Sequence, residues 1–175
     1  MKDIIAKAAH IKLVVFDVDG VLTDGSLFIG DAGEEYKAFH AKDGLGMKLL
    51  QATGVEIGII TARTSELVQH RMESLNIQHI YQGRLNKLPA LEEIINKVGV
   101  SFDETAYVGD DVIDLPAMRK VGLAISVQDA HPLVKQHSHW QTPHVGGRGA
   151  ARDVCELIME AQNTLQAQFD KYLHD

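Results

Sequence analysis

Two carboxylates follow the first apolar run of the chain, and their spacing suggests a reaction. The run from Ile11 to Phe16 ends at Asp17-Val18-Asp19-Gly20. Because side chains of a strand alternate between its faces, Asp17 and Asp19 can project from the same side of the strand end. Two acids so close repel each other unless a divalent cation, which prefers oxygen ligands, lies between them. The motif therefore predicts a metal-assisted site that a phosphate can approach.

A second group of acids follows a later apolar run. The segment Ala106-Tyr107-Val108 leads into Gly109-Asp110-Asp111-Val112-Ile113-Asp114. Capping of the next helix explains one acid, Asp111 or Asp114, but does not readily explain all three. Hard carboxylates without a nearby cysteine favour Mg²⁺ over zinc. We therefore expect an oxygen-rich Mg²⁺ site.

Thr61 and Lys87 are further candidates, each with an ordinary alternative. Thr61 and Arg63 follow the run Gly58-Ile59-Ile60, where a hydroxyl can donate to a phosphate oxygen beside the N–H groups of the next helix. Taken alone, Thr61 also fits a helix cap and Arg63 a solvated charge. Lys87 begins a helical pattern, at the end where the helix dipole disfavours a cation. It is either solvated or compensated by an anion.

The elements that must position these residues alternate along the chain. Short apolar runs predict strands, and the segments between them have the spacing of helices. This alternation is typical of an α/β fold with a doubly wound parallel sheet. Without a repeat or linker, we expect one domain over residues 1–175. The predicted strands are 13–16, 55–60, 79–81, 105–108 and 123–125, and the predicted helices are 44–52, 64–75, 87–98 and 115–121.

Two segments lie outside the alternation. Residues 23–39, with the turn-like Gly30-Asp31-Ala32-Gly33, predict a β-hairpin inserted after the first strand. Its segment Leu27-Phe28-Ile29 is apolar on both faces, so it either packs on its own domain or contacts another subunit. After the glycines of 146–149, apolar residues at helical spacing predict a final helix over about 150–173.

Composition excludes several classes of protein. The formal charge is −7 and no cluster of Lys and Arg is visible, which disfavours nucleic-acid binding. A lone cysteine, Cys155, rules out an internal disulfide, and no apolar segment is long enough for a membrane span or signal peptide. We expect a soluble cytoplasmic protein. The irregularly spaced His131, His137, His139 and His144 are interpreted as ordinary loop residues without an assigned role.

In order and spacing, these motifs resemble the haloacid dehalogenase superfamily of phosphohydrolases. The resemblance implies that Asp17 is the nucleophile and Asp19 the general acid and base. It also implies that Mg²⁺ is held by the Asp17 side chain, the Asp19 main-chain carbonyl and Asp110, with Asp111 or Asp114 orienting these ligands. Thr61 and Lys87 would bind the phosphoryl oxygens. No segment is long enough for a separate cap domain, so only the hairpin is available to cover the site.

More specific motifs lie at residues 16–25, 42–46, 60–63, 81–83, 86–87 and 146–150. They resemble the phosphatases of 3-deoxy-D-manno-octulosonate 8-phosphate. That subfamily implies release of the sugar acid Kdo for lipopolysaccharide synthesis, in a homotetramer whose hairpins meet at its centre. A nine-carbon keto-acid 9-phosphate and a non-catalytic phosphatase-like subunit are the alternatives. This chain has Lys42 and Leu45 where the subfamily has an arginine and an aromatic residue. The motifs therefore define the preferred sugar less well than they define the phosphatase reaction. The implied substrate-binding residues are Thr61, Ala62, Arg63, Lys42 and Arg148, the last lying in a glycine-rich segment that either reaches a site or simply turns into the final helix.

Overall fold

A six-stranded parallel sheet forms the centre of the protein. The computed structural model describes residues 1–173, and every paired neighbour in this sheet is parallel. The predicted α/β fold and all five predicted strands are confirmed. The strands in spatial order are β5 (His79–Tyr81), β4 (Glu56–Ile60), β1 (Leu13–Phe16), β6 (Thr105–Gly109), β7 (Leu123–Ser126) and β8 (Trp140–Gln141).

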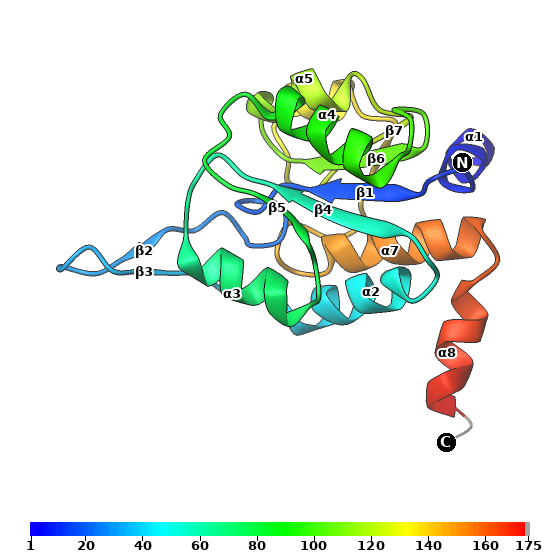
Figure 1. Ribbon diagram of the computed structural model, residues 1–175, viewed down its shortest axis with the longest axis horizontal. Helices are drawn as coiled ribbons and strands as arrows, with labels where there is room; N and C mark the ends of the chain where they lie inside the picture. The colour runs from blue at the N-terminus through cyan, green and yellow to red at the C-terminus, as the bar shows by residue number, and fades with distance from the viewer. Residues whose placement is uncertain (174–175) are drawn as a thin grey trace.

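Helices cover both faces of the sheet (Figure 1). The helices α4 (Lys87–Val98) and α5 (Leu115–Met118) lie on one face. On the other lie α2 (Ala41–Gln51), α3 (Glu66–Ser74) and α7 (Ala150–Ala161). All four residues of β1 are buried, because a strand covered on both faces needs apolar side chains on both. Within residues 1–173, no helix is long and apolar enough to cross a membrane.

Two predicted helices differ from the structure. The helix predicted over 115–121 is the shorter α5, which ends at Met118. A single 3₁₀ turn, η1 (Val112–Asp114), precedes it. The expected helix over about 150–173 is two helices, α7 and α8 (Leu165–Leu173). Between them Asn163 takes the left-handed conformation with φ 56°, and the amide of Thr164 bonds back to the Met159 carbonyl at 2.8 Å. This closing turn ends α7 although the apolar spacing continues.

The histidine-rich segment is not simply a loop, which corrects that interpretation. It contains α6 (Pro132–Gln136) and the edge strand β8. His131 Nδ1 caps α6 by accepting from the Leu133 amide at 3.1 Å, and His139 Nδ1 accepts from the Ala124 amide at 2.8 Å. Helix α1 (Lys2–Ala8) was not predicted either, because only Ala8 of its residues is buried and the apolar pattern is weak.

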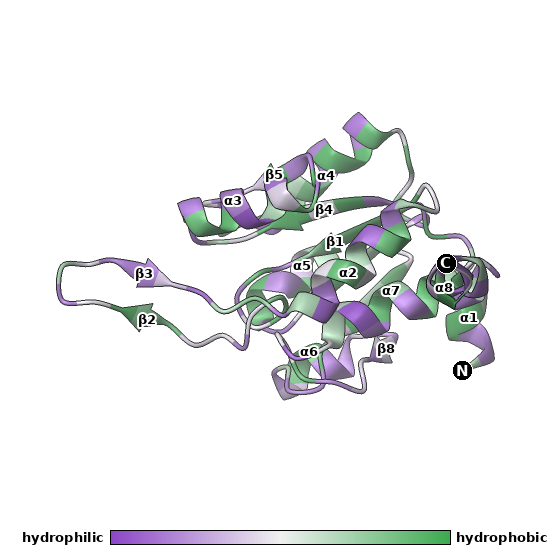
Figure 2. Cartoon of the chain, turned by 90° about the horizontal axis from the view of Figure 1, so that it is seen from below, coloured by the Kyte–Doolittle hydropathy of each residue, from purple (hydrophilic) through white to green (hydrophobic). Residues whose placement is uncertain are grey.

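The predicted hairpin is present and extends away from the sheet (Figures 1 and 2). Its strands are β2 (Phe28–Ile29) and β3 (Glu35–Tyr36), which pair antiparallel. Phe28, Ile29 and Tyr36 are 55%, 64% and 63% exposed, and Leu27 is 48% exposed. The interpretation that one face packs on its own domain is therefore wrong for these residues. Their exposure leaves a contact with another subunit as the prediction to be tested.

Candidate active site

The carboxyl ends of three adjacent strands bring the predicted residues together. Phe16, the last residue of β1, pairs with Ile59 of β4 and Val108 of β6. Polar residues that follow these strands therefore meet at one edge of the sheet, where α/β proteins bind ligands. They line a cavity of about 220 Å³, whose lining residues are Asp17, Asp19, Thr61, Ala62, Arg63, Asp110, Asp111 and Ile113.

Thr61 lines this cavity and is not a helix cap. Helix α3 begins at Glu66 with Ser65 as its N-cap residue, so the capping alternative for Thr61 is wrong. The Thr61 side chain is buried, and its hydroxyl oxygen accepts weakly from the Arg63 amide at 3.4 Å. The hydroxyl can donate to an anion in the cavity.

Lys87 is fully buried between two carboxylates. Its Nζ lies 2.6 Å from Asp17 Oδ2 and 2.7 Å from Asp114 Oδ1. Burial alone would lower the pKa of this ammonium, but the two carboxylates outweigh burial and raise it. The solvated alternative is therefore wrong, and the compensating anions are carboxylates of the chain itself. A cation so close to Asp17 can also neutralise charge on a group bound there.

The carboxylate of Asp114 holds the backbone of the acidic segment 110–114 in place through hydrogen bonds. Besides Lys87, its carboxylate accepts from the hydroxyl of Tyr107 at 2.9 Å and from the amides of Asp110 and Asp111 at 3.0 and 3.3 Å. A Cβ at Gly109 would lie 2.6 Å from the Cβ of Asp114, so glycine is needed there. Tyr107 was missed in the sequence, where it reads as one more apolar strand residue. Its buried hydroxyl identifies it as a partner of Asp114.

Asp111 has a local role in the structure. Its carboxylate accepts from the Val112 amide at 2.7 Å and forms a capping box with Asp114 at the start of η1. Both residues predicted as possible caps therefore contribute to this turn. Asp114 also orients the segment that carries Asp110, so it fits the predicted supporting role better than Asp111.

Three carboxylates form a candidate cation site. Asp17, Asp110 and Asp114 offer oxygen atoms that all lie within 4.8 Å of one another. Asp110 Oδ1 is buried without a hydrogen-bond partner among residues 1–173. Burial, and after it the negative charge of Asp17, raises the pKa of Asp110 to about 8. Burial, and after it the negative charge of Asp114, raises the pKa of Asp17 to about 7. A divalent cation would supply the missing ligand contact and favour the ionised forms.

Gly20 makes room for Asp110. Gly20 has φ +90°, and a Cβ at this position would lie 2.1 Å from Asp110 Oδ2. The glycine that follows the first acidic pair is therefore required both by the backbone conformation and by the close approach of the second acidic segment.

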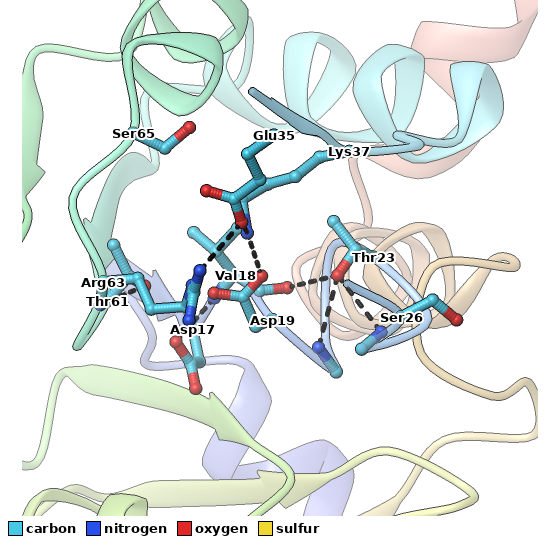
Figure 3. Close-up of polar contacts among 12 residues, drawn as sticks. Asp17, Val18, Asp19, Thr23, Ser26, Glu35, Lys37, Thr61, Arg63 and Ser65 are labelled. Atoms are coloured by element: carbon cyan, nitrogen blue, oxygen red, sulfur yellow. Dashed lines mark hydrogen bonds and ion pairs between the residues drawn. The ribbon is translucent and has the colours of Figure 1, made fainter. Parts of the chain in front are cut away.

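Asp19 lines the cavity but is not part of the three-carboxylate cluster. Its carboxylate instead contacts the hairpin (Figure 3). The ammonium of Lys37 donates to Asp19 Oδ1. Lys37 Nζ also lies 3.0 Å from Glu35 Oε1, which pairs with Arg63 Nη2 at 3.1 Å. Lys37 and Glu35 were not predicted as site residues, although a two-residue spacing in extended chain puts both side chains on one face.

Two predicted substrate-binding residues do not line the cavity. Lys42 is exposed on α2, and Arg148 pairs with Asp24 at 3.3 Å. The glycines before Arg148 instead pack on the loop after β1: the Gly147 amide donates to the Val21 carbonyl at 2.8 Å, and a Cβ at Gly146 would lie 1.8 Å from the Gly20 carbonyl oxygen. This segment therefore does more than turn the chain into α7, because it supports the loop that carries Asp19.

Comparisons with known proteins agree with this geometry. Residues 74–152 match the family model of haloacid dehalogenase-like hydrolases. The 3-deoxy-D-manno-octulosonate 8-phosphate phosphatase of Escherichia coli K12 is 47% identical over 163 residues, covering 93% of this chain and 87% of the relative.

Solved structures of phosphatases with the same name are also similar to this chain. The Moraxella catarrhalis 3-deoxy-D-manno-octulosonate 8-phosphate phosphatase, crystallised with a magnesium ion, a phosphate ion and KDO, is 43% identical with a TM-score of 0.96, covering 98% of this chain and 99% of that one. The Yersinia pestis phosphatase of the same name is 44% identical with a TM-score of 0.93, covering 94% and 89%.

Proposed function

Because this chain belongs to the 3-deoxy-D-manno-octulosonate 8-phosphate phosphatases within the haloacid dehalogenase-like hydrolases, we propose that it hydrolyses that sugar phosphate to Kdo and phosphate with Mg²⁺ as cofactor. The observation that carries this proposal is the arrangement around Asp17. Its carboxylate contacts Lys87, shares an oxygen cluster with Asp110, and lines one cavity with Asp19 and Thr61. In this proposal the nucleophile Asp17 therefore lies next to a cation and a metal site, and it shares its cavity with the acid Asp19.

Each residue has a chemical role in this proposal. Asp17 attacks the phosphorus and forms an aspartyl-phosphate, while Asp19 gives a proton to the leaving sugar oxygen. Asp19 then takes a proton from the water that releases phosphate and regenerates Asp17. Lys87 and Thr61 stabilise the phosphoryl oxygens.

The cation site fits Mg²⁺, because its donors are carboxylate oxygens. Asp17, Asp110 and the main-chain carbonyl of Asp19 would hold the ion, with Asp114 orienting Asp110. When bound, Mg²⁺ supplies positive charge that offsets repulsion between the phosphate and the acidic residues.

The metal assignment makes a prediction for Asp110. Asp110→Ala is expected to raise the Mg²⁺ concentration for half-maximal phosphate release by at least about tenfold, because a ligand oxygen and a charge are lost. A Mg²⁺ titration of phosphate release measures this. Asp103→Ala, at an exposed acid outside the cavity, is the control. Full activity of the wild type in a chelator would show that no divalent ion is needed.

Among cationic candidates for the sugar acid, Arg63 is the one that lines the cavity. We assign substrate contacts to Thr61, Ala62 and Arg63 in a single chain. Lys42 and Arg148 remain candidates only if ligand binding or a neighbouring subunit brings them to the site. A nine-carbon keto-acid 9-phosphate needs the same phosphate chemistry, so substrate length is the property that experiment must separate.

Phosphate release from a panel of substrates tests the function. The panel contains 3-deoxy-D-manno-octulosonate 8-phosphate, a nine-carbon keto-acid 9-phosphate, glucose 6-phosphate and p-nitrophenyl phosphate, each with Mg²⁺ or chelator. We expect the highest kcat/KM for the eight-carbon substrate. Preference for the nine-carbon substrate would change the assigned sugar. No release from any substrate would favour the non-catalytic alternative.

The wider biology is proposed on the same basis. We propose that the enzyme supplies Kdo for lipopolysaccharide synthesis and that it acts in the cytoplasm. We further propose that residues 1–175 form one phosphatase domain without a separate cap domain. Residues 174 and 175 lie outside the part of the chain that the structure describes.

The exposed hairpin supports a homotetramer with the hairpins at its centre. Leu27, Phe28, Ile29 and Tyr36 leave apolar side chains exposed to water on both faces of the hairpin. The hairpin itself extends away from the rest of the chain (Figure 2). Coverage by other subunits would also shield the aspartyl-phosphate from bulk water.

Charged residues in the hairpin are expected to break this assembly. The double variant Leu27→Glu, Ile29→Glu should sediment as smaller species than the wild type and lose activity on the sugar phosphate, because unpaired charges are costly at a buried contact. Leu133→Lys, at a partly exposed leucine of α6, is the control. A fully active wild-type monomer in sedimentation experiments would contradict the proposed tetramer.

A further inference from the structure

Lys37 joins the exposed hairpin to the proposed acid and base of the reaction. It directly follows β3, yet its ammonium reaches Asp19 in the loop after β1 (Figure 3). The same ammonium contacts Glu35, which in turn accepts from Arg63 in the loop after β4. These ion pairs therefore connect the hairpin with two of the three loops that line the cavity, those after β1 and β4.

The burial of Lys37 distinguishes it from an ordinary surface lysine. Its side chain is 1% exposed, although the backbone around it is partly exposed and the neighbouring Tyr36 is an exposed residue. Burying an ammonium is costly unless carboxylates replace its water shell. Asp19 and Glu35 do this here, with side chains that are themselves only 21% and 20% exposed. Lys37 is therefore fixed by partners on two different segments.

The contact leaves one oxygen of Asp19 available. Lys37 donates to Oδ1, while Oδ2 has no hydrogen-bond partner among residues 1–173. A carboxyl group that exchanges a proton with substrate must present one particular oxygen, within hydrogen-bond reach of the reacting atom. A cation held on Oδ1 restricts rotation of the carboxyl group and assigns proton transfer to Oδ2.

We propose that Lys37 is a positioning residue for Asp19, and that through it the hairpin prepares the site for proton transfer. This inference rests on the proposed function and concerns both steps. In the first, the Asp17 oxygen bonds to phosphorus as the bond to the sugar oxygen breaks, and Asp19 Oδ2 supplies the proton to that oxygen. In the second, water bonds to phosphorus as the bond to Asp17 breaks, and Oδ2 takes the proton of the water.

The two steps let an experiment separate positioning from general damage. For p-nitrophenyl phosphate, formation of the aspartyl-phosphate needs little proton donation, because the leaving group is acidic. The value of kcat/KM covers steps up to this phosphoryl transfer, while kcat also includes hydrolysis of the intermediate.

Lys37→Met should therefore lower kcat/KM for the sugar phosphate by about 10²-fold, within the range of general acid catalysis. It should leave kcat/KM for p-nitrophenyl phosphate nearly unchanged and lower its kcat. A burst of p-nitrophenol, equal in amount to the enzyme, should precede slow turnover. Asp19→Asn should give the same pattern, and Lys37→Arg should restore most of the sugar-phosphate activity, because a cation returns.

Lys48→Met, at an exposed lysine of α2, is the matched control. Melting temperature and sedimentation are compared first, and Lys37→Gln replaces the methionine variant if that variant does not fold. Equal loss of kcat/KM on both substrates, or wild-type activity on both, would overturn the positioning role. Absence of phosphate release by the wild type would instead overturn the proposed function on which the role depends.

Discussion

Replacing Asp17 with asparagine is expected to reduce phosphate release by a factor on the order of 10⁴ or more, the scale of loss when a covalent nucleophile is removed. The amide has nearly the same shape as the carboxylate but cannot act as an anionic nucleophile. It also withdraws a negative charge from the candidate cation site, so the chemistry and the metal site are weakened together.

The fold should survive this change. Asp17 is buried next to Asp114, and both its burial and that neighbouring charge raise its pKa to about 7, so its charge is costly to the folded state. Lys87 keeps Asp114 as a partner in the variant. The comparison uses phosphate release and the melting temperature, with Asp3→Asn on the exposed side of α1 as the control. Substantial turnover by folded Asp17→Asn protein would exclude Asp17 as the nucleophile.

Much of the site could be predicted from local sequence because strand ends leave a local signal. Asp17, Thr61 and Asp110 each follow an apolar run, and parallel strands end at one edge of a sheet. The runs themselves are recognisable because central strands are apolar on both faces. The meeting of these three residues at one edge of the sheet can therefore be predicted from the order of strands and helices, without knowledge of side-chain packing.

Contacts between distant segments left no comparable signal. From the sequence Lys87 could be predicted as solvated or as compensated by an anion, but not as lying between Asp17 and Asp114. Lys37 lies in a hairpin of two-residue strands, and its partner Asp19 is 18 positions away. The sequence left Gly146 and Gly147 either in a segment that reaches a site or in a turn into the final helix, whereas their small size is required by the loop after β1. Each of these roles depends on tertiary packing, which periodicity does not describe.

Lys87→Met is expected to have the second large effect, on both activity and stability. Methionine approximates the length of lysine without its charge, so the phosphoryl group loses a neighbouring cation. We expect kcat/KM to fall by about 10²- to 10³-fold, as when one donor to a developing anion is removed. Asp17 and Asp114 would then share a buried site without their cation, and breaking a buried pair costs about 3–5 kcal/mol of unfolding free energy.

The stability loss should depend on pH in a definite direction. Lys87 lowers the pKa of Asp17, so without it the folded state binds a proton more tightly still. A carboxyl that binds protons more tightly folded than unfolded stabilises the fold at low pH and loses that contribution as pH rises through its folded-state pKa. In chelator, the variant should therefore melt closest to wild type near pH 5 and farthest below it near pH 8. Lys120→Met, at an exposed lysine, should show no such trend. A difference in melting temperature that is constant across this range would mean that Lys87 contributes packing rather than charge to the fold.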